Sequence, residues 1–166
     1  QPDVYAVQGY DTGLLLVPWM QMAAASDPGA AGVLGRLRNV PGVLSATAAD
    51  QAPYDATAWS VQVWTATHPA TKHVVSVFLG DEDFASTLGM ATSAGRHFMT
   101  HEFRDYRGDQ TELQAGTQSV LVSSALASRP YGRSDPLGPP LLTAPRARLR
   151  VVGVSESTPP PAGARG

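Results

Sequence analysis

Short apolar stretches bounded by turn-forming residues recur along this sequence, and most are too short for helices. The clearest is 59–64, where Trp59, Val61 and Val63 alternate with polar residues while Trp64 falls on the opposite face. This alternation predicts a strand with one buried face, and it makes Trp64 a candidate for exposure. The other stretches with strand character are 5–10, 13–17, 43–48, 74–79, 120–122 and a hairpin over 141–154.

Helix signals occur at three places. Asp27 and Pro28 favour the start of a first helix, and Asn39 followed by Pro41-Gly42 ends it. The apolar face of this helix carries Ala30, Val33, Leu34 and Leu37.

The second predicted helix is a short one after 74–79. Asp81 stands at its start, and Phe84 and Leu88 lie one turn apart, so both face the same neighbour. Gly89 follows where a left-handed residue is needed to end the helix.

The third predicted helix follows the strand 120–122. Ser123 or Ser124 caps it, it runs through Ser128, and Pro130 breaks it. The stretch 132–140 consists mainly of turn formers, and 100–117 is polar enough to predict a long loop with room for one turn of helix.

Strand–helix–strand units therefore appear twice, which predicts an α+β fold of two lobes. We expect a core domain over 1–157, with lobe one at about 1–50, a short β-rich junction at 51–72 and lobe two at about 73–157. The Pro/Gly-rich tail 158–166 is expected to be an extended linker.

Composition narrows the function classes. The absence of cysteine excludes structural disulfides, thiol catalysis and cysteine-ligated metals. The net charge of -2 gives no reason to expect nucleic acid as a partner. No apolar run reaches the roughly 20 residues of a membrane span, since the longest candidate, 14–17, stops at Pro18.

Three segments in the C-terminal two-thirds carry an ordered set of motifs. The first runs from Asp83 to Met90 and continues into Gly95-Arg96-His97-Phe98. The second, 120–127, leads to Tyr131-Gly132 and Pro136-Leu137-Gly138. The third ends in Val151-Val152-Gly153-Val154.

In this order and spacing, the segments resemble the extracytoplasmic core domain of MacB-type permeases, in the FtsX-like superfamily of ABC transporter permeases. Upstream, Val40-Pro41-Gly42-Val43 resembles the motif that ends the first helix in that family. Ala85 replaces a second aromatic residue, Tyr131 stands where Phe is commoner, and Pro139 follows Gly138 where a polar residue is typical. The matched positions that we expect to be structural are Pro41, Gly42, Phe84, Leu88, Gly89, Gly95, Arg96, Phe98, Ser123, Gly132, Gly138 and Gly153.

The resemblance implies a non-enzymatic domain on the periplasmic face of the bacterial inner membrane, excised from between the first two transmembrane helices of a permease. It would couple ATP hydrolysis by a separate cytoplasmic ATPase to periplasmic movement for export or extrusion. Its partners would be the membrane helices of the same permease and that ATPase. A second permease copy, an adaptor or a lipoprotein are further candidates, although the short junction 51–72 leaves little room for the inserted subdomain that meets an adaptor in this family.

The residues leave two other functions open. One is a freestanding extracytoplasmic ligand-binding or sensory module, which needs an enclosed apolar pocket. The other is a metal-dependent hydrolase built on His97, His101 and Glu102. In that pattern Phe98 stands where a zinc protease has its glutamate, and no third ligand is evident, so we expect neither metal nor cofactor.

Several polar residues have a simpler interpretation than catalysis. Ser123 and Ser124 are not surrounded by a Gly-x-Ser-x-Gly elbow, so capping is the favoured role. Arg96 after Gly95 is placed to donate hydrogen bonds to backbone carbonyls. The residues we would watch for partner contact are Trp64, Arg146, Arg148 and Arg150, the three arginines forming the solvent face of one strand.

Overall fold

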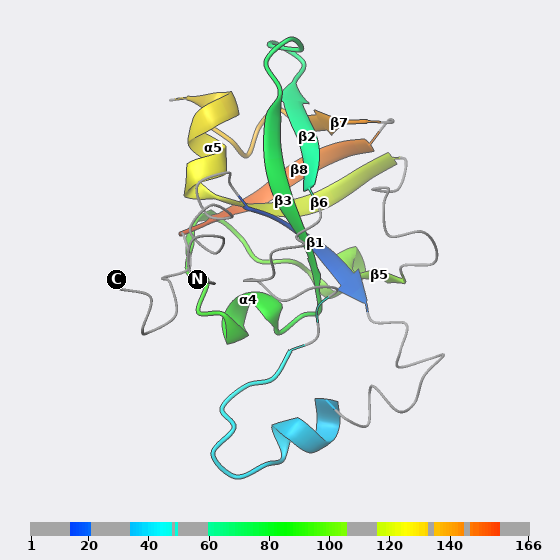
Figure 1. Ribbon diagram of the computed structural model, residues 1–166, viewed down its shortest axis with the longest axis vertical. Helices are drawn as coiled ribbons and strands as arrows, with labels where there is room; N and C mark the ends of the chain where they lie inside the picture. The colour runs from blue at the N-terminus through cyan, green and yellow to red at the C-terminus, as the bar shows by residue number, and fades with distance from the viewer. Residues whose placement is uncertain are drawn as a thin grey trace, which may run out of the picture.

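The computed structural model describes residues 14–20, 34–47, 49, 60–105, 116–132, 135–144 and 147–156. Among them, one eight-stranded sheet is accompanied by the short helices α4 and α5, the 3₁₀ helix η1 and a helical turn at 34–38 (Figure 1). The elements in chain order are β1 (Leu14–Met20), β2 (Ser60–Thr65), β3 (His73–Gly80), α4 (Phe84–Thr87), β4 (Thr92–Gly95), η1 (Thr100–Glu102), β5 (Arg104–Asp105), β6 (Gly116–Ser123), α5 (Ser124–Tyr131), β7 (Leu141–Thr143) and β8 (Ala147–Ser155).

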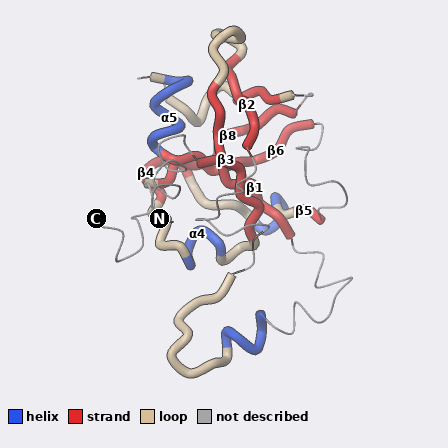
Figure 2. The backbone as a smooth tube through the Cα atoms, viewed as in Figure 1, coloured by secondary structure: helices blue, strands red, loops and turns tan. Residues whose placement is uncertain are grey.

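The sheet curls until it closes on itself. β1 pairs with both β3 and β6, so the strands β1, β3, β2, β7, β8 and β6 form a closed circuit (Figure 2). The β1–β3 and β6–β8 pairs are parallel and the other pairs in the circuit are antiparallel. β4 pairs with β8 beyond the end of β7, and β5 pairs in parallel with the last two residues of β1. The α+β class predicted from the sequence is confirmed at the coarse level of a mixed α/β domain.

Both faces of the sheet are covered where its strands are most apolar. Val77 of β3 and Val122 of β6 belong to a core cluster that α5 closes with Leu126. Phe78, next to Val77, faces a second cluster built around Phe84 of α4. This burial on both faces explains why 75–79 is apolar except for Ser76, whereas β2 alternates between more and less exposed residues.

The predicted division into two lobes stays a prediction. β1 comes from the first predicted lobe, β2 from the junction and β3 to β8 from the second lobe, and all of them pair within the same sheet. The predicted strand at 5–10, most of the first helix, Arg146 and the linker 158–166 lie outside the described residues. No helix in the described part of the chain is long and apolar enough to cross a membrane.

The strand predicted at 43–48 is wrong. Residues 43–47 have no regular secondary structure, and only Ala49 forms a bridge, to Gly80. Side chains rather than backbone pairing hold this segment, because Ser45 bonds Thr87 and Thr47 donates to Asp81.

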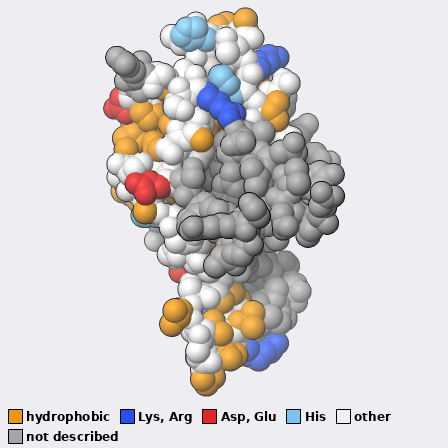
Figure 3. Space-filling view, turned by 60° about the vertical axis from the view of Figure 1, so that its left-hand side comes forward, with side chains coloured by type: hydrophobic (Ala, Val, Ile, Leu, Met, Phe, Trp, Pro, Cys, Tyr) orange, Lys and Arg blue, Asp and Glu red, His pale blue; other side chains and the backbone are white. Residues whose placement is uncertain are grey.

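The segment 34–47, including the helical turn 34–38, lies at the lower end of the molecule away from the strands (Figure 1). Hydrophobic side chains lie on the surface there (Figure 3). Those with substantial exposure are Leu37, Val40, Val43 and Leu44.

Helix α5 begins as predicted but does not end at Ser128. It continues through Pro130 to Tyr131, and Gly132, with φ of 58°, ends it. Pro130 lies in the last turn, so it removes only one intrahelical N–H bond and the helix need not break before it. The predicted loop 100–117 contains η1, the one helical turn allowed for it, but β5 interrupts it and β6 already begins at Gly116.

Replacing Ser123 with alanine should lower the free energy of unfolding by about 1 kcal/mol. The Ser123 hydroxyl accepts a hydrogen bond from the Leu126 amide at 3.2 Å, and the residue is 6% exposed. Urea denaturation monitored by circular dichroism measures the change. Ser124→Ala is the matched control, because Ser124 is exposed and should change stability by less than about 0.5 kcal/mol. Equal losses in both variants would contradict the capping role.

Candidate functional site

Two of the sequence motifs meet at a pair of glycines. Gly95, the last residue of β4, pairs with Gly153 of β8. A Cβ added to Gly95 would lie 2.3 Å from the Val152 carbonyl oxygen, and one added to Gly153 would lie 2.4 Å from the Arg96 oxygen. Gly95 also has φ of 76°, which side chains disfavour. Only glycine at both positions allows the two backbones to come this close.

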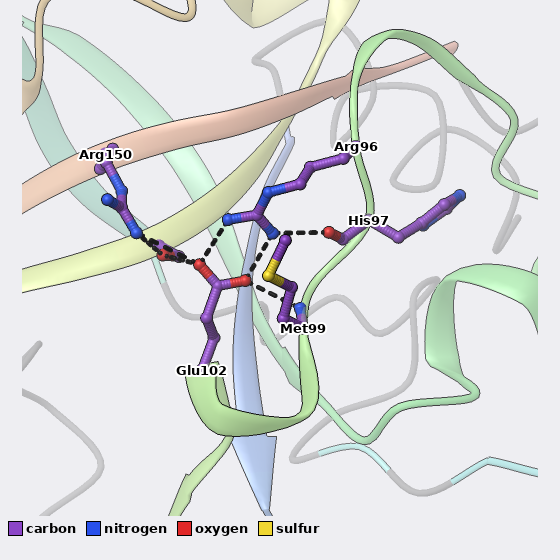
Figure 4. A network of polar contacts seen from close by, with 6 residues as sticks. Arg96, His97, Met99, Glu102 and Arg150 are labelled. Carbon is purple, nitrogen blue, oxygen red and sulfur yellow. Dashed lines mark hydrogen bonds and ion pairs between the residues drawn. The ribbon is translucent and has the colours of Figure 1, made fainter.

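The side chain of Arg96, the residue after Gly95, extends toward Glu102 (Figure 4). Its two terminal nitrogens reach the two carboxylate oxygens of Glu102 at 2.6 and 2.9 Å. Arg96 also donates to the His97 backbone carbonyl at 2.8 Å, which is the kind of bond expected from the sequence. A bidentate arginine–carboxylate pair fixes both distance and orientation, so it anchors the loop between β4 and η1.

Glu102 is buried and has further donors on every side. The Met99 amide donates to it at 2.8 Å and the Ser119 hydroxyl at 2.6 Å, while Arg150 lies 3.3 Å away. We call Arg96, Met99, Glu102, Ser119 and Arg150 the Glu102 cluster. It joins the motif loop to β6 and β8, three segments far apart in sequence.

The cluster determines what Glu102 can do chemically. The hydrogen bond from Arg96, followed by those from Ser119 and Met99, holds the pKa of the Glu102 carboxyl well below its usual range despite burial. Such a carboxylate is ionised at neutral pH and is a weak base, since a useful general base has a pKa near the working pH. The geometry therefore supports a structural role for Glu102, which holds the motif loop to the sheet, rather than a role in proton transfer.

The residues of the sequence-derived metal hypothesis do not form a ligand set. Glu102 faces Arg96, His97 Nε2 bonds the Thr92 hydroxyl at 2.8 Å, and His101 is exposed. Within the described part of the chain, no three His, Cys, Asp or Glu residues are grouped as a metal site.

A pocket of about 190 Å³ opens beside the Glu102 cluster. Phe98 and Phe103 form part of its wall with their rings edge to face, 5.8 Å between centroids. The remaining lining combines carboxylate, hydroxyl, imidazole and methyl groups from Asp81, Glu82, Ala85, Ser86, His97 and Thr100. The walls are mixed in polarity, and Ser86 and His97 are each bonded to other groups, the Asp83 carbonyl and the Thr92 hydroxyl.

Two departures from the family pattern contact each other. The hydroxyl of Tyr131, which stands where phenylalanine is commoner, donates to the Pro139 carbonyl at 2.8 Å. Burial raises the pKa of Tyr131 to about 12, so the hydroxyl keeps its proton. The bond attaches the end of α5 to the turn around Gly138, which leads into β7.

The candidate partner residues differ in exposure and in the contacts that they make. Trp64 is half-buried on β2, with the Lys72 ammonium 5.2 Å from its ring centroid. Arg148 is exposed on β8, as the alternation predicted, and Arg150 is exposed but bonded to Glu102. Sequence reasoning missed the Arg96–Glu102 pair, because a glutamate six residues after a motif arginine has no distinguishing pattern.

Comparison with known proteins gives one coarse likeness. A crystal structure of the periplasmic region of MacB from Actinobacillus actinomycetemcomitans overlaps 87% of this chain with a TM-score of 0.47 and 14% sequence identity. The match spans 60% of that chain. No residue role is transferred at this level of likeness. No family model matches the sequence, and no curated protein matches it.

Proposed function

We propose that this chain is a non-enzymatic extracytoplasmic domain of an ABC transporter permease, which transmits movement driven by a cytoplasmic ATPase to the periplasm for export or extrusion. The observation that carries the proposal is the Gly95–Gly153 contact. The Gly-Arg-x-Phe and Val-Val-Gly-Val motifs of the family pattern pack against each other at this contact. Each motif needs its glycine, because a side chain at that position would clash with the backbone of the other motif.

The arrangement suits a domain that transmits force. The strand circuit is closed by pairing, both of its core clusters are buried, and the Glu102 cluster ties the motif loop to two strands. Densely packed, hydrogen-bonded bodies resist local deformation. We therefore expect the sheet domain to move as one stiff unit, with a second permease copy, an adaptor or a lipoprotein as its contacts outside the membrane.

The ligand-binding alternative receives less support. Pockets for small molecules usually have about 300–1,000 Å³ and mainly apolar walls. The pocket beside α4 has about 190 Å³ and mixed polarity.

The proposed location can be tested in the intact protein in bacterial cells. This chain has no cysteine, so any native cysteines elsewhere in the protein are first removed and Ser128→Cys is introduced at an exposed position of α5. A maleimide that cannot cross the inner membrane should label this cysteine in cells whose outer membrane alone is permeabilised. Val75→Cys, at a fully buried position, is the matched control and should react only after denaturation. Labelling of Ser128→Cys only after lysis of the inner membrane would exclude the proposed location.

A further inference from the structure

The outward face of the sheet carries a row of residues brought together by strand register. Trp64 of β2 pairs with Leu142 of β7, Leu142 pairs with Arg148 of β8, and Arg148 pairs with Thr117 of β6. Residues directly opposite one another in a sheet point to the same face. Four strands from three regions of the sequence thus place their side chains in one line.

This row lies on the face of the sheet opposite the core cluster. The neighbouring residues Val63, Leu141 and Leu149 are fully buried in the core cluster. Trp64 and Leu142 are half-buried, and Arg148 is exposed.

Two further residues widen the row. Val74 of β3 is 50% exposed and pairs with Gln62, two residues before Trp64 on the same face. Lys72 holds its ammonium over the Trp64 ring. We call Trp64, Lys72, Val74, Leu142 and Arg148 the basic strip.

The strands that form the strip supply positive charges and no negative ones. The stretches 60–80, 116–132 and 141–155, which supply β2, β3, β6, β7 and β8, contain no aspartate or glutamate. Arg148 makes no hydrogen bond or ion pair with any residue that the structure describes, and Lys72 is likewise without an ion pair there. Arg150, next on the same face, is already engaged by Glu102. Two cations therefore lie beside an aromatic ring and two aliphatic side chains with their charge uncompensated.

We propose that the basic strip is a docking surface for an acidic, partly apolar peptide segment of a partner protein. Its carboxylates would pair with Arg148 and Lys72, and its apolar side chains would cover Trp64, Val74 and Leu142. Tryptophan and arginine are the residues enriched where interfaces gain most of their binding energy. The net charge of -2 repels long polyanions such as nucleic acid, and it repels an anionic membrane surface. A short acidic segment interacts mainly with the cations next to it, because charges farther away are screened by salt.

The test uses a fluorescein-labelled ten-residue peptide of alternating glutamate and leucine, titrated with the whole chain and followed by fluorescence anisotropy. Binding should weaken about tenfold in the double variant Lys72→Gln/Arg148→Gln. It should also weaken as salt rises from 50 to 300 mM, because exposed charge pairs are screened. Trp64→Leu should weaken binding while leaving the salt dependence unchanged, because it removes aromatic contact area and no charge.

Controls decide between a specific surface and general charge attraction. Arg36→Gln removes an exposed cation from the helical turn 34–38, away from the strip, and should leave binding unchanged. A peptide with glutamine in place of glutamate should bind at least tenfold more weakly. Equal weakening by Arg36→Gln, equal binding of the glutamine peptide, or tighter binding to phosphatidylserine vesicles or single-stranded DNA than to the acidic peptide would each overturn the proposal. Circular dichroism of every variant checks that the fold is retained, and the assay does not depend on the proposed transport function.

Discussion

Replacing Glu102 with glutamine should lower the free energy of unfolding by about 2 kcal/mol at pH 7. Glutamine keeps the shape but loses the charge that Arg96 faces, and its amide nitrogen cannot accept the hydrogen bonds that one of the two carboxylate oxygens accepts. Because the Glu102 side chain is only 4% exposed, water cannot readily replace the lost interactions. Urea denaturation curves of the wild type and the variant measure the difference.

Glu82→Gln is the matched control for this substitution. Glu82 is an exposed carboxylate on the wall of the nearby pocket, so its neutralisation should change stability by less than about 0.5 kcal/mol. A Glu102→Gln loss no larger than that of Glu82→Gln would show that the cluster contributes nothing beyond ordinary surface charge.

The same substitution gives a pH-dependent result with a defined sign. The pKa of Glu102 is lowered in the folded state from its ordinary value of 4.5, so the folded protein binds its proton less readily than the unfolded chain does. The stabilisation by the carboxylate is therefore complete above about pH 4.5 and declines as the pH falls toward the folded-state pKa. We expect the stability gap between wild type and Glu102→Gln to be constant from pH 7 to 5 and to shrink below pH 4.5. A gap that widens on acidification would contradict the lowered pKa.

Much of the local structure could be predicted from the sequence. The alternation around Val63 predicted β2, and the capping residue Ser123 predicted the start of α5. The alternating arginines predicted the exposed face of β8. These features follow from short-range rules on periodicity and capping. The mainly apolar stretch 74–79 predicted a buried strand, and it is buried from Val75 onward while Val74 is exposed.

The closure of the sheet could not be predicted in the same way. It depends on β1 pairing with β3 and β6, whose partner residues are about 60 and more than 100 positions away. No local pattern specifies such a pairing. The strand expected at 43–48 failed for a related reason, because its apolar residues suit an edge strand but side chains such as Thr47 hold the segment to the turn before α4 instead.

The candidate site shows the same contrast. Gly95, Arg96 and Gly153 were recognisable as motif positions, yet their mutual contact requires β4 to reach β8. Glu102 was noticed only as a metal-ligand candidate, since its true partners Ser119 and Arg150 are supplied by other strands. Most residues of the candidate site could therefore be identified from the sequence, whereas their contacts with one another depend on the pairing of distant strands.

Replacing Gly153 with alanine should cost about 3 kcal/mol or more, the largest effect expected for any substitution considered. The added Cβ would lie 2.4 Å from the Arg96 carbonyl oxygen and 2.8 Å from Leu121 Cδ2. The Leu121 side chain can adjust, but the carbonyl belongs to a backbone held by the bond from the Arg96 amide to the Val152 oxygen at 2.9 Å. The motif loop must therefore separate from β8, which also pulls Arg96 away from Glu102.

Gly138→Ala is the matched control, because the nearest atom to its added Cβ is the Asp135 oxygen at an ordinary 3.7 Å. It should change the free energy of unfolding by less than about 0.5 kcal/mol. Gly95→Ala should be as damaging as Gly153→Ala, and the double variant should cost less than the sum of the two, since either substitution already breaks the same contact. If Gly153→Ala fails to fold while Gly138→Ala folds normally, the close approach of the two backbones is supported. A Gly153→Ala protein whose free energy of unfolding lies within 1 kcal/mol of the wild-type value would disprove it. An additive double variant would show that the two glycines act independently, and the observation on which the proposed function rests would then be lost.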